Sequence, residues 1–225
     1  MFKLDMTTKP LSSAINPRLA FTFMLYAVLV VSTIVLFEDV VTINLFSIMS
    51  IKVSGCLFPY VFLYPLSFIV LRLYGYRNTN IMIGSMMITT LIFVLIVQSV
   101  GYFSEASSQM INTYTGINKV YEVAFKMYLA GFIAMPAGIY MSFLAMSLFT
   151  RINIGFNLFT LSIATIIGEI ANTFIAFPLG LFKTYDFATI FSQFILGALI
   201  FKIIAAIILS IPTAIFFKLY ARQTQ

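Results

Sequence analysis

The chain has 225 residues, of which 61% are hydrophobic and 9% are charged, and its formal net charge is +6. A soluble domain carries roughly 25% charged residues, and a chain this apolar could not cover its surface with polar groups in water. The composition therefore predicts an integral membrane protein and excludes a soluble enzyme, a disordered chain and a disulfide scaffold. Apolar runs that are continuous, with no alternation, also exclude a transmembrane β-barrel.

The missing residue types restrict the chemistry further. The chain contains no His, which excludes His-based zinc sites, haem held by His and Ser-His-Asp triads. Cys56 is the only Cys, so no internal disulfide or iron–sulfur site can form, and we interpret it as a small apolar packing residue. No phosphate-binding GxxxxGK[ST] loop is present. We therefore expect no cofactor, no bound metal and no enzymatic activity.

Six stretches of the chain are long and apolar enough to cross a bilayer, whose core takes roughly 20 helical residues. Their approximate bounds are 19–37, 53–73, 81–103, 127–149, 156–182 and 188–220. Six crossings place both termini on one side of the membrane. The sequence therefore predicts an all-α membrane protein with six transmembrane helices, folded as a single domain over residues 1–225.

Two connecting segments need comment. Residues 1–18 are polar and basic and lack the short apolar stretch and cleavage site of a secretory signal peptide, so we expect the first span to stay in the mature protein. In the connection 38–52, apolar and polar residues alternate roughly. Over so few residues this favours a surface loop with some apolar anchoring, with a short strand or an interfacial stretch as the alternative.

Basic residues are distributed unevenly between the two predicted sides. The side with the termini has eight basic residues against one acidic residue, a net charge of +7, and the other side has four against five, a net charge of −1. The eight are Lys3, Lys9, Arg18, Arg72, Arg77, Arg151, Lys218 and Arg222. An excess of Lys and Arg marks the cytoplasmic side. Both termini should therefore be cytoplasmic, and the basic charge indicates membrane orientation and not nucleic-acid binding.

Two charged residues lie near the middle of predicted spans, Glu169 in the fifth and Lys202 in the sixth. A charge at the centre of a spanning helix costs about 2.5–3.5 kcal/mol on insertion scales when it faces lipid. Consecutive spans run antiparallel, so the two residues lie at a similar depth and could pair. They form either a structural ion pair or a polar site for a substrate or a proton, and we favour the second interpretation because ionisable groups inside membranes are usually functional.

The surroundings of Glu169 strengthen that interpretation. Ser162, Thr165, Glu169 and Asn172 follow one another at spacings of 3, 4 and 3 residues, so they share one helix face. A polar face cannot be exposed to lipid tails. It must face other helices or a cavity.

The fourth span has a face of small residues. They are Gly131, Ala134, Gly138, Ser142 and Ala145. Small residues allow two helices to approach closely. The face indicates tight packing or, alternatively, a shallow wall that leaves space for a flat ligand.

Arg72 lies at the inner end of the second span, shortly before Gly75. Its side chain can extend to the headgroups or turn inward as a hydrogen-bond donor or a partner for Glu169. We expect Gly75 to end this helix.

Several of these landmarks together resemble one family. Phe58-Pro59, followed by an apolar run into Arg72-Leu-Tyr-Gly75, resembles the second-span signature of the VUT family, the queuosine precursor transporters. Gly168-Glu169-Ile-Ala-Asn172-Thr173 is similar to the fifth-span pattern of that family, and Lys202 with Pro212 is similar to its sixth-span pattern. The resemblance covers residues from about 55 to 220.

The resemblance implies a six-helix importer of a 7-deazaguanine base in the bacterial inner membrane. Family positions that carry polar groups fall on Phe68 in the second span, on Ile139 and Ser142 in the fourth and on Asn172 in the fifth. A member with a less polar or less cationic substrate fits equally well. The candidate substrate-binding residues are Glu169, Asn172, Lys202, Thr165, Arg72, Ser142 and Phe68.

The preferred hypothesis is thus a small-molecule importer whose partners are a nucleobase-like substrate and the lipid bilayer. A second is the substrate-binding subunit of a vitamin-type energy-coupling transporter, although the Ala-x-x-x-Ala docking pattern typical of those subunits is missing from the first span. A third is a membrane scaffold held by Glu169 and Lys202. The sequence leaves open the substrate, the energy source and whether the chain forms a homodimer or joins an ATPase module.

Overall fold

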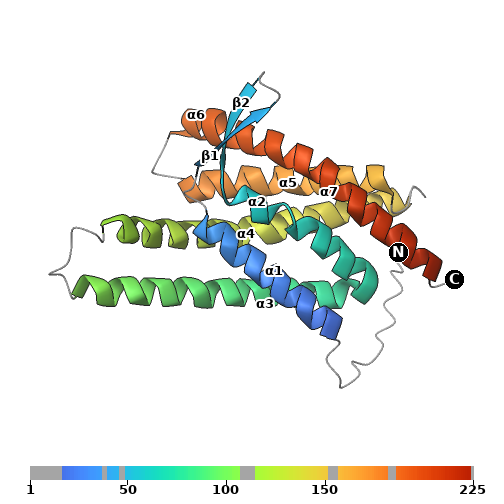
Figure 1. The fold of residues 1–225 in the computed structure, drawn as a ribbon, viewed down its shortest axis with the longest axis horizontal. Helices are drawn as coiled ribbons and strands as arrows, with labels where there is room; N and C mark the ends of the chain where they lie inside the picture. Colours follow the sequence, from blue (N-terminus) through green and yellow to red (C-terminus); the bar gives the residue numbers. More distant parts are fainter. Residues whose placement is uncertain are drawn as a thin grey trace.

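The computed structural model describes residues 17–36, 40–45, 49–106, 115–151, 157–181 and 186–223. Its helices are α1 (Pro17–Val35), α2 (Leu57–Tyr60), α3 (Leu63–Ala106), α4 (Thr115–Arg151), α5 (Leu158–Leu181), α6 (Phe187–Thr189) and α7 (Leu196–Gln223). The π-helix η2 (Ile190–Ile195) joins α6 to α7, and β1 (Val40–Leu45) and β2 (Met49–Ser54) are the strands. The long helices form a bundle (Figure 1).

Four helical stretches within the described residues are long and apolar enough to cross a membrane. They are Leu57–Ile96, Leu129–Arg151, Leu158–Leu181 and Ile190–Leu219, and a shorter apolar helix covers Pro17–Thr33. Large apolar side chains such as Ile88, Leu144 and Ile208 are exposed on the outside of the bundle, where a lipid-facing surface requires them. The chain is therefore a multi-pass helical membrane protein.

Helix α3 consists of two arms that meet at Gly75. The backbone of Gly75 has φ 81° and ψ 172°, a conformation that residues with a Cβ atom rarely adopt. Figure 1 shows that the chain reverses its direction there, so the two arms are separate helices in space. The prediction that Gly75 ends the second helix is confirmed. The expected gap between the second and third spans is almost absent, because the next arm begins directly after Gly75.

The connection between α1 and α2 is a β-hairpin. Strands β1 and β2 pair antiparallel, from Val40 opposite Ser54 to Leu45 opposite Met49. The expected surface loop is therefore wrong for these residues and the strand alternative is correct, since β-branched residues favour strands. The second predicted span also begins too early, because residues 53 and 54 belong to β2 and the helix starts at Leu57.

The other predicted spans differ from the helices mainly at their ends. Helix α4 begins at Thr115 although its predicted apolar span begins at residue 127, because hydropathy detects the part of a helix that fits in lipid and not its polar extension. The predicted polar segment before α1 and the charged residues 38 and 39 lie outside the described residues.

Helices α4 and α5 pack with their backbones in close approach. A Cβ atom on Gly168 would lie 2.6 Å from the carbonyl oxygen of Gly138 and 2.8 Å from the Cβ of Ser142. A Cβ on Gly138 would lie 2.8 Å from the Gly168 carbonyl oxygen and would overlap the hydroxyl of Tyr64. The small-residue face of the fourth span is therefore a packing surface at Gly138 and Ser142.

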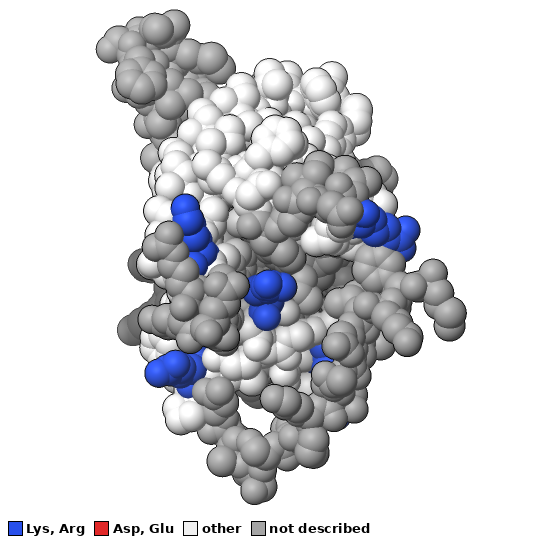
Figure 2. Space-filling view, turned by 90° about the vertical axis from the view of Figure 1, so that its right-hand side faces the viewer, with Lys and Arg blue, Asp and Glu red and all other residues white. Residues whose placement is uncertain are grey.

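The buried apolar core lies mainly among α1, α3, α4 and α5, and a second, smaller cluster lies where α2, α5 and α7 meet. The start of α1, the reversal within α3, the end of α4 and the end of α7 all lie at the right-hand end of the molecule in Figure 1. Figure 2 shows this end, where Lys and Arg side chains gather and no acidic side chain of the described residues is visible. Arg18, Arg72, Arg77, Arg151 and Lys218 belong to helix segments that begin, end or turn at this end.

Candidate functional site

A buried ion pair links α5 to α7. The Nζ atom of Lys202 lies 2.9 Å from Oε2 of Glu169, and each side chain is 2% exposed. The similar depth expected for these residues in antiparallel helices is thereby confirmed, and neither charge faces the outside of the bundle. A pair at this depth avoids the cost of leaving either charge in hydrocarbon.

Lys202 also binds neutral groups of its neighbours. Its ammonium donates to Oδ1 of Asn172 and to Oγ1 of Thr173, both at 3.0 Å. The same Nζ atom lies 4.4 Å from the centroid of the Tyr60 ring, within the range of a cation–π interaction. An ammonium has three N–H donors; two of them bond to Asn172 and Thr173, and its charge is paired with that of Glu169. Within the described residues, Oε2 of Glu169 has no hydrogen-bond partner and relies on its ion pair with Lys202.

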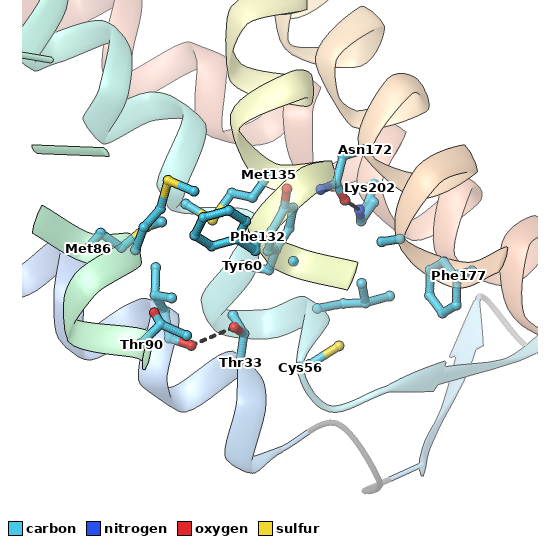
Figure 3. A pocket seen from close by; sticks show the side chains of 15 residues that line it. Thr33, Cys56, Tyr60, Met86, Thr90, Phe132, Met135, Asn172, Phe177 and Lys202 are labelled. Carbon is cyan, nitrogen blue, oxygen red and sulfur yellow. Dashed lines mark hydrogen bonds between the residues drawn. The ribbon is translucent and has the colours of Figure 1, made fainter. Parts of the chain in front are cut away.

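A cavity of about 90 Å³ lies beside this network. Six helical segments contribute to its wall: α1, α2, the second arm of α3, α4, α5 and α7. The lining residues are Val30, Thr33, Cys56, Leu57, Tyr60, Met86, Met87, Thr90, Gly131, Phe132, Met135, Asn172, Ala176, Phe177 and Lys202. Most are apolar, and the rings of Tyr60, Phe132 and Phe177 offer flat surfaces (Figure 3). A small ligand that is mainly apolar, with few polar groups, fits such a lining.

Two of the seven sequence-predicted site residues, Asn172 and Lys202, line the cavity. Glu169 is not among the lining residues, and its carboxylate instead contacts the ammonium of Lys202. Lys202, the only charged residue that the described part of the chain contributes to the wall, therefore has its charge balanced by an adjacent one. This arrangement gives a site with hydrogen-bonding capacity and little net charge.

The other four predicted residues lie outside the wall of this cavity. Thr165 is buried on α5, and the Ser142 hydroxyl donates to the carbonyl oxygen of Ile139 at 2.7 Å. Phe68 is buried with its ring edge-on to Phe143, at a centroid distance of 5.6 Å. Arg72 lies three residues before the turn at Gly75. Their role in substrate binding stays a prediction.

The lining includes one residue of the small-residue face and others that the sequence does not single out. Gly131 has no atom within 4 Å of an added Cβ and lines the cavity, so the small-residue face of α4 is open at this point. Tyr60 and Thr90 carry polar groups and line the cavity. Their positions gave no signal, because Tyr and Thr are common in spanning helices and Thr usually bonds to its own backbone. No group of three His, Cys, Asp or Glu side chains within the described residues could hold a metal ion.

Comparison with known proteins identifies the family. The family model described as "Putative vitamin uptake transporter" matches residues 53–217, which is most of the chain and includes every cavity-lining residue except two on α1. No curated protein and no solved structure matched the chain. The match agrees with the multi-pass helical architecture and with the resemblance noted in the sequence. The chain therefore belongs to the VUT family of vitamin uptake transporters.

Proposed function

We propose that the protein imports a small, flat, neutral molecule of nucleobase-like chemistry across the bacterial inner membrane, and that the cavity beside Lys202 is its binding site. The supporting observation is the cavity itself, which combines an amide, aromatic rings and a compensated ammonium. Membership of the VUT family supports the uptake function. A 7-deazaguanine base, or a pterin of similar shape, has the flat body and the hydrogen-bonding edge that such a wall can hold.

Neutrality of the substrate follows from the charges. The Lys202 ammonium already faces Glu169, Asn172 and Thr173. A substrate anion would compete with Glu169 for that ammonium, and a substrate cation would be desolvated beside it. Either charge would be costly in a mainly apolar site. A neutral edge can use the Asn172 amide, which both donates and accepts hydrogen bonds.

The proposed topology has six crossings with both termini in the cytoplasm. Counting α1 and the two arms of α3 separately, together with α4, α5 and α7, gives six helical segments. Lys and Arg gather at the end of the bundle where α1 begins and α7 ends (Figure 2), which the positive-inside rule assigns to the cytoplasm. We propose that this carrier performs no catalytic step.

Transport by the isolated protein is the direct test. Full-length protein in proteoliposomes that contain no ATPase should take up labelled 7-deazaguanine or pterin above the rate of empty vesicles. Asn172→Leu should reduce the initial rate strongly, because it replaces the amide in the cavity wall by an apolar group of similar size. Lys218→Met, on the exposed end of α7, is the matched control and should transport like the wild type.

The outcome also separates the alternatives. Uptake that appears only when an ATPase module is supplied would favour a substrate-binding subunit of an energy-coupling transporter. Absence of binding and of uptake for both probes, in protein that is folded, would contradict the proposed substrate class. Wild-type uptake in Glu169→Gln and Lys202→Met would remove the ion pair from the mechanism.

A further inference from the structure

Thr90 is an unusual hydroxyl in this structure. It lies on the second arm of α3, is 7% exposed and lines the cavity. Its Oγ1 atom has no hydrogen-bond partner among the described residues. On the same arm, the hydroxyls of Ser85, Thr89 and Ser99 each donate to a carbonyl oxygen three or four residues earlier, which is the usual arrangement in a helix. A buried hydroxyl without a partner is unfavourable, so a partner from outside the chain would stabilise it.

The opposite end of the cavity offers a second polar group. Figure 3 shows Asn172 and Lys202 on one side and Thr90 on the other, with Tyr60 and Phe132 between them. Oδ1 of Asn172 is occupied by the Lys202 ammonium. The Nδ2 group donates to none of the described residues, so it can donate to a ligand. The cavity therefore presents a hydrogen-bonding group at each end, with two aromatic rings between them.

The middle of the cavity fixes the kind of body that fits. Phe132 of α4 lies there (Figure 3), and Met86 of α3 and Met135 of α4 also line the cavity. Aromatic faces and thioethers contact flat rings favourably. A ligand that forms hydrogen bonds at both ends of the cavity must therefore carry a polar edge for Asn172. It must also carry one further polar substituent on the opposite side of its ring system, for Thr90.

We propose that Thr90 is a specificity-determining residue for a neutral heteroaromatic ligand. Asn172 binds one edge of the ligand, and Thr90 recognises a polar substituent on the opposite edge. This proposal rests on the proposed function, because it takes the cavity as the substrate site. It adds that the ligand is a substituted ring system and not the bare base. The hydroxyl can donate to or accept from the substituent, so a hydroxyl, carbonyl or nitrile would serve.

Two probes that differ by one substituent test this directly. Binding of pterin and of 6-hydroxymethylpterin to the full-length protein in detergent is measured by titration calorimetry. The wild type should bind the hydroxymethyl compound about three- to tenfold more tightly, the net value of one hydrogen bond. Thr90→Val should abolish this preference, and Thr90→Ser, which keeps the hydroxyl, should retain it. Thr89→Val, whose hydroxyl is exposed and bonded to Ser85, should leave it unchanged. A preference that survives Thr90→Val would overturn the proposal.

The thermal stability of the ligand-free protein gives an independent readout. Thr213 on α7 is buried to a similar extent, and its hydroxyl donates to the Leu209 carbonyl oxygen at 2.8 Å. Thr213→Val should lower the melting temperature, whereas Thr90→Val should leave it unchanged or raise it. An equal drop in both variants would show that the Thr90 hydroxyl is already bonded within the protein and would overturn the proposal. If the wild type binds neither pterin, the proposed substrate class fails, and the melting temperatures still decide whether Thr90 holds its hydroxyl free for a ligand.

Discussion

Removing the ammonium of Lys202 should destabilise the protein more than any other change to the buried network. Lys202→Met keeps an unbranched side chain of similar length but leaves Glu169 buried, where its Oε2 atom has no hydrogen-bond partner within the described residues. Asn172 and Thr173 lose their donor at the same time. Breaking a buried pair by deleting one partner costs about 3–5 kcal/mol, and we expect a loss of unfolding free energy in this range.

The opposite deletion should cost less. Glu169→Gln leaves Lys202 with two neutral acceptors and the face of Tyr60, and losing one charged partner is worth about 1.5–3 kcal/mol. The double variant removes both charges. Since buried pairs replaced by neutral groups of similar volume are often near neutral in stability, the double variant should be more stable than Lys202→Met alone.

The assay is reversible unfolding of the full-length protein in bicelles, analysed as a double-mutant cycle. Lys218→Met, at an exposed position near the end of α7, is the control and should change the unfolding free energy by no more than about 0.5 kcal/mol. The reasoning is refuted if the losses from the two single variants simply add in the double variant, because additivity would mean that the two charges do not stabilise each other.

The remaining predictions concern packing and the cavity. Gly168→Ala should lower the unfolding free energy by about 1–3 kcal/mol through overpacking, because the new Cβ would lie 2.6 Å from the Gly138 carbonyl oxygen. The control is Gly84→Ala, whose new Cβ has no atom within 4 Å, and it should be neutral or stabilising in the same assay. Gly131→Leu should fill the cavity and abolish pterin uptake in proteoliposomes while the unfolding free energy stays close to wild type; retained uptake would place the site elsewhere. Pterin-6-carboxylate should enter at least about tenfold more slowly than pterin, because its charge must be desolvated, and equal initial rates would contradict a neutral-substrate site.

The sequence predicts the site residues whose polar or charged side chains would be costly to bury in a membrane without a partner. Glu169 and Lys202 could be recognised because a charge in the middle of an apolar span requires a partner, and Asn172 because it shares a helix face with Glu169. Phe68 and Ser142 came from the family resemblance, and both are buried, yet they contact other parts of the bundle. Residue spacing shows which side chains share one face of a helix, but it does not show which face of that helix lines a cavity.

Other features depend on contacts that hydropathy does not encode. Thr90 is indistinguishable in sequence from the neighbouring Thr89, and only the packing of the surrounding helices makes one hydroxyl buried and the other exposed. The sequence favours a loop over the strand alternative in the hairpin, because twelve paired residues with weak alternation resemble an apolar loop. Gly75 is predicted as a helix end because glycine commonly caps the C-terminus of a helix, but the sequence does not show the tight reversal that follows it.

The contact between Gly138 and Gly168 limits how the protein can move. Because two backbones touch there, any sliding of α4 along α5 would drive carbonyl oxygens into neighbouring atoms. The two helices should therefore travel as one rigid body through the transport cycle. Opening the cavity to either side of the membrane must then come from displacement of α1, α3 or α7 against this pair. A cross-link between α4 and α5 should therefore leave transport turnover intact, whereas a cross-link between α3 and α4 should stop it.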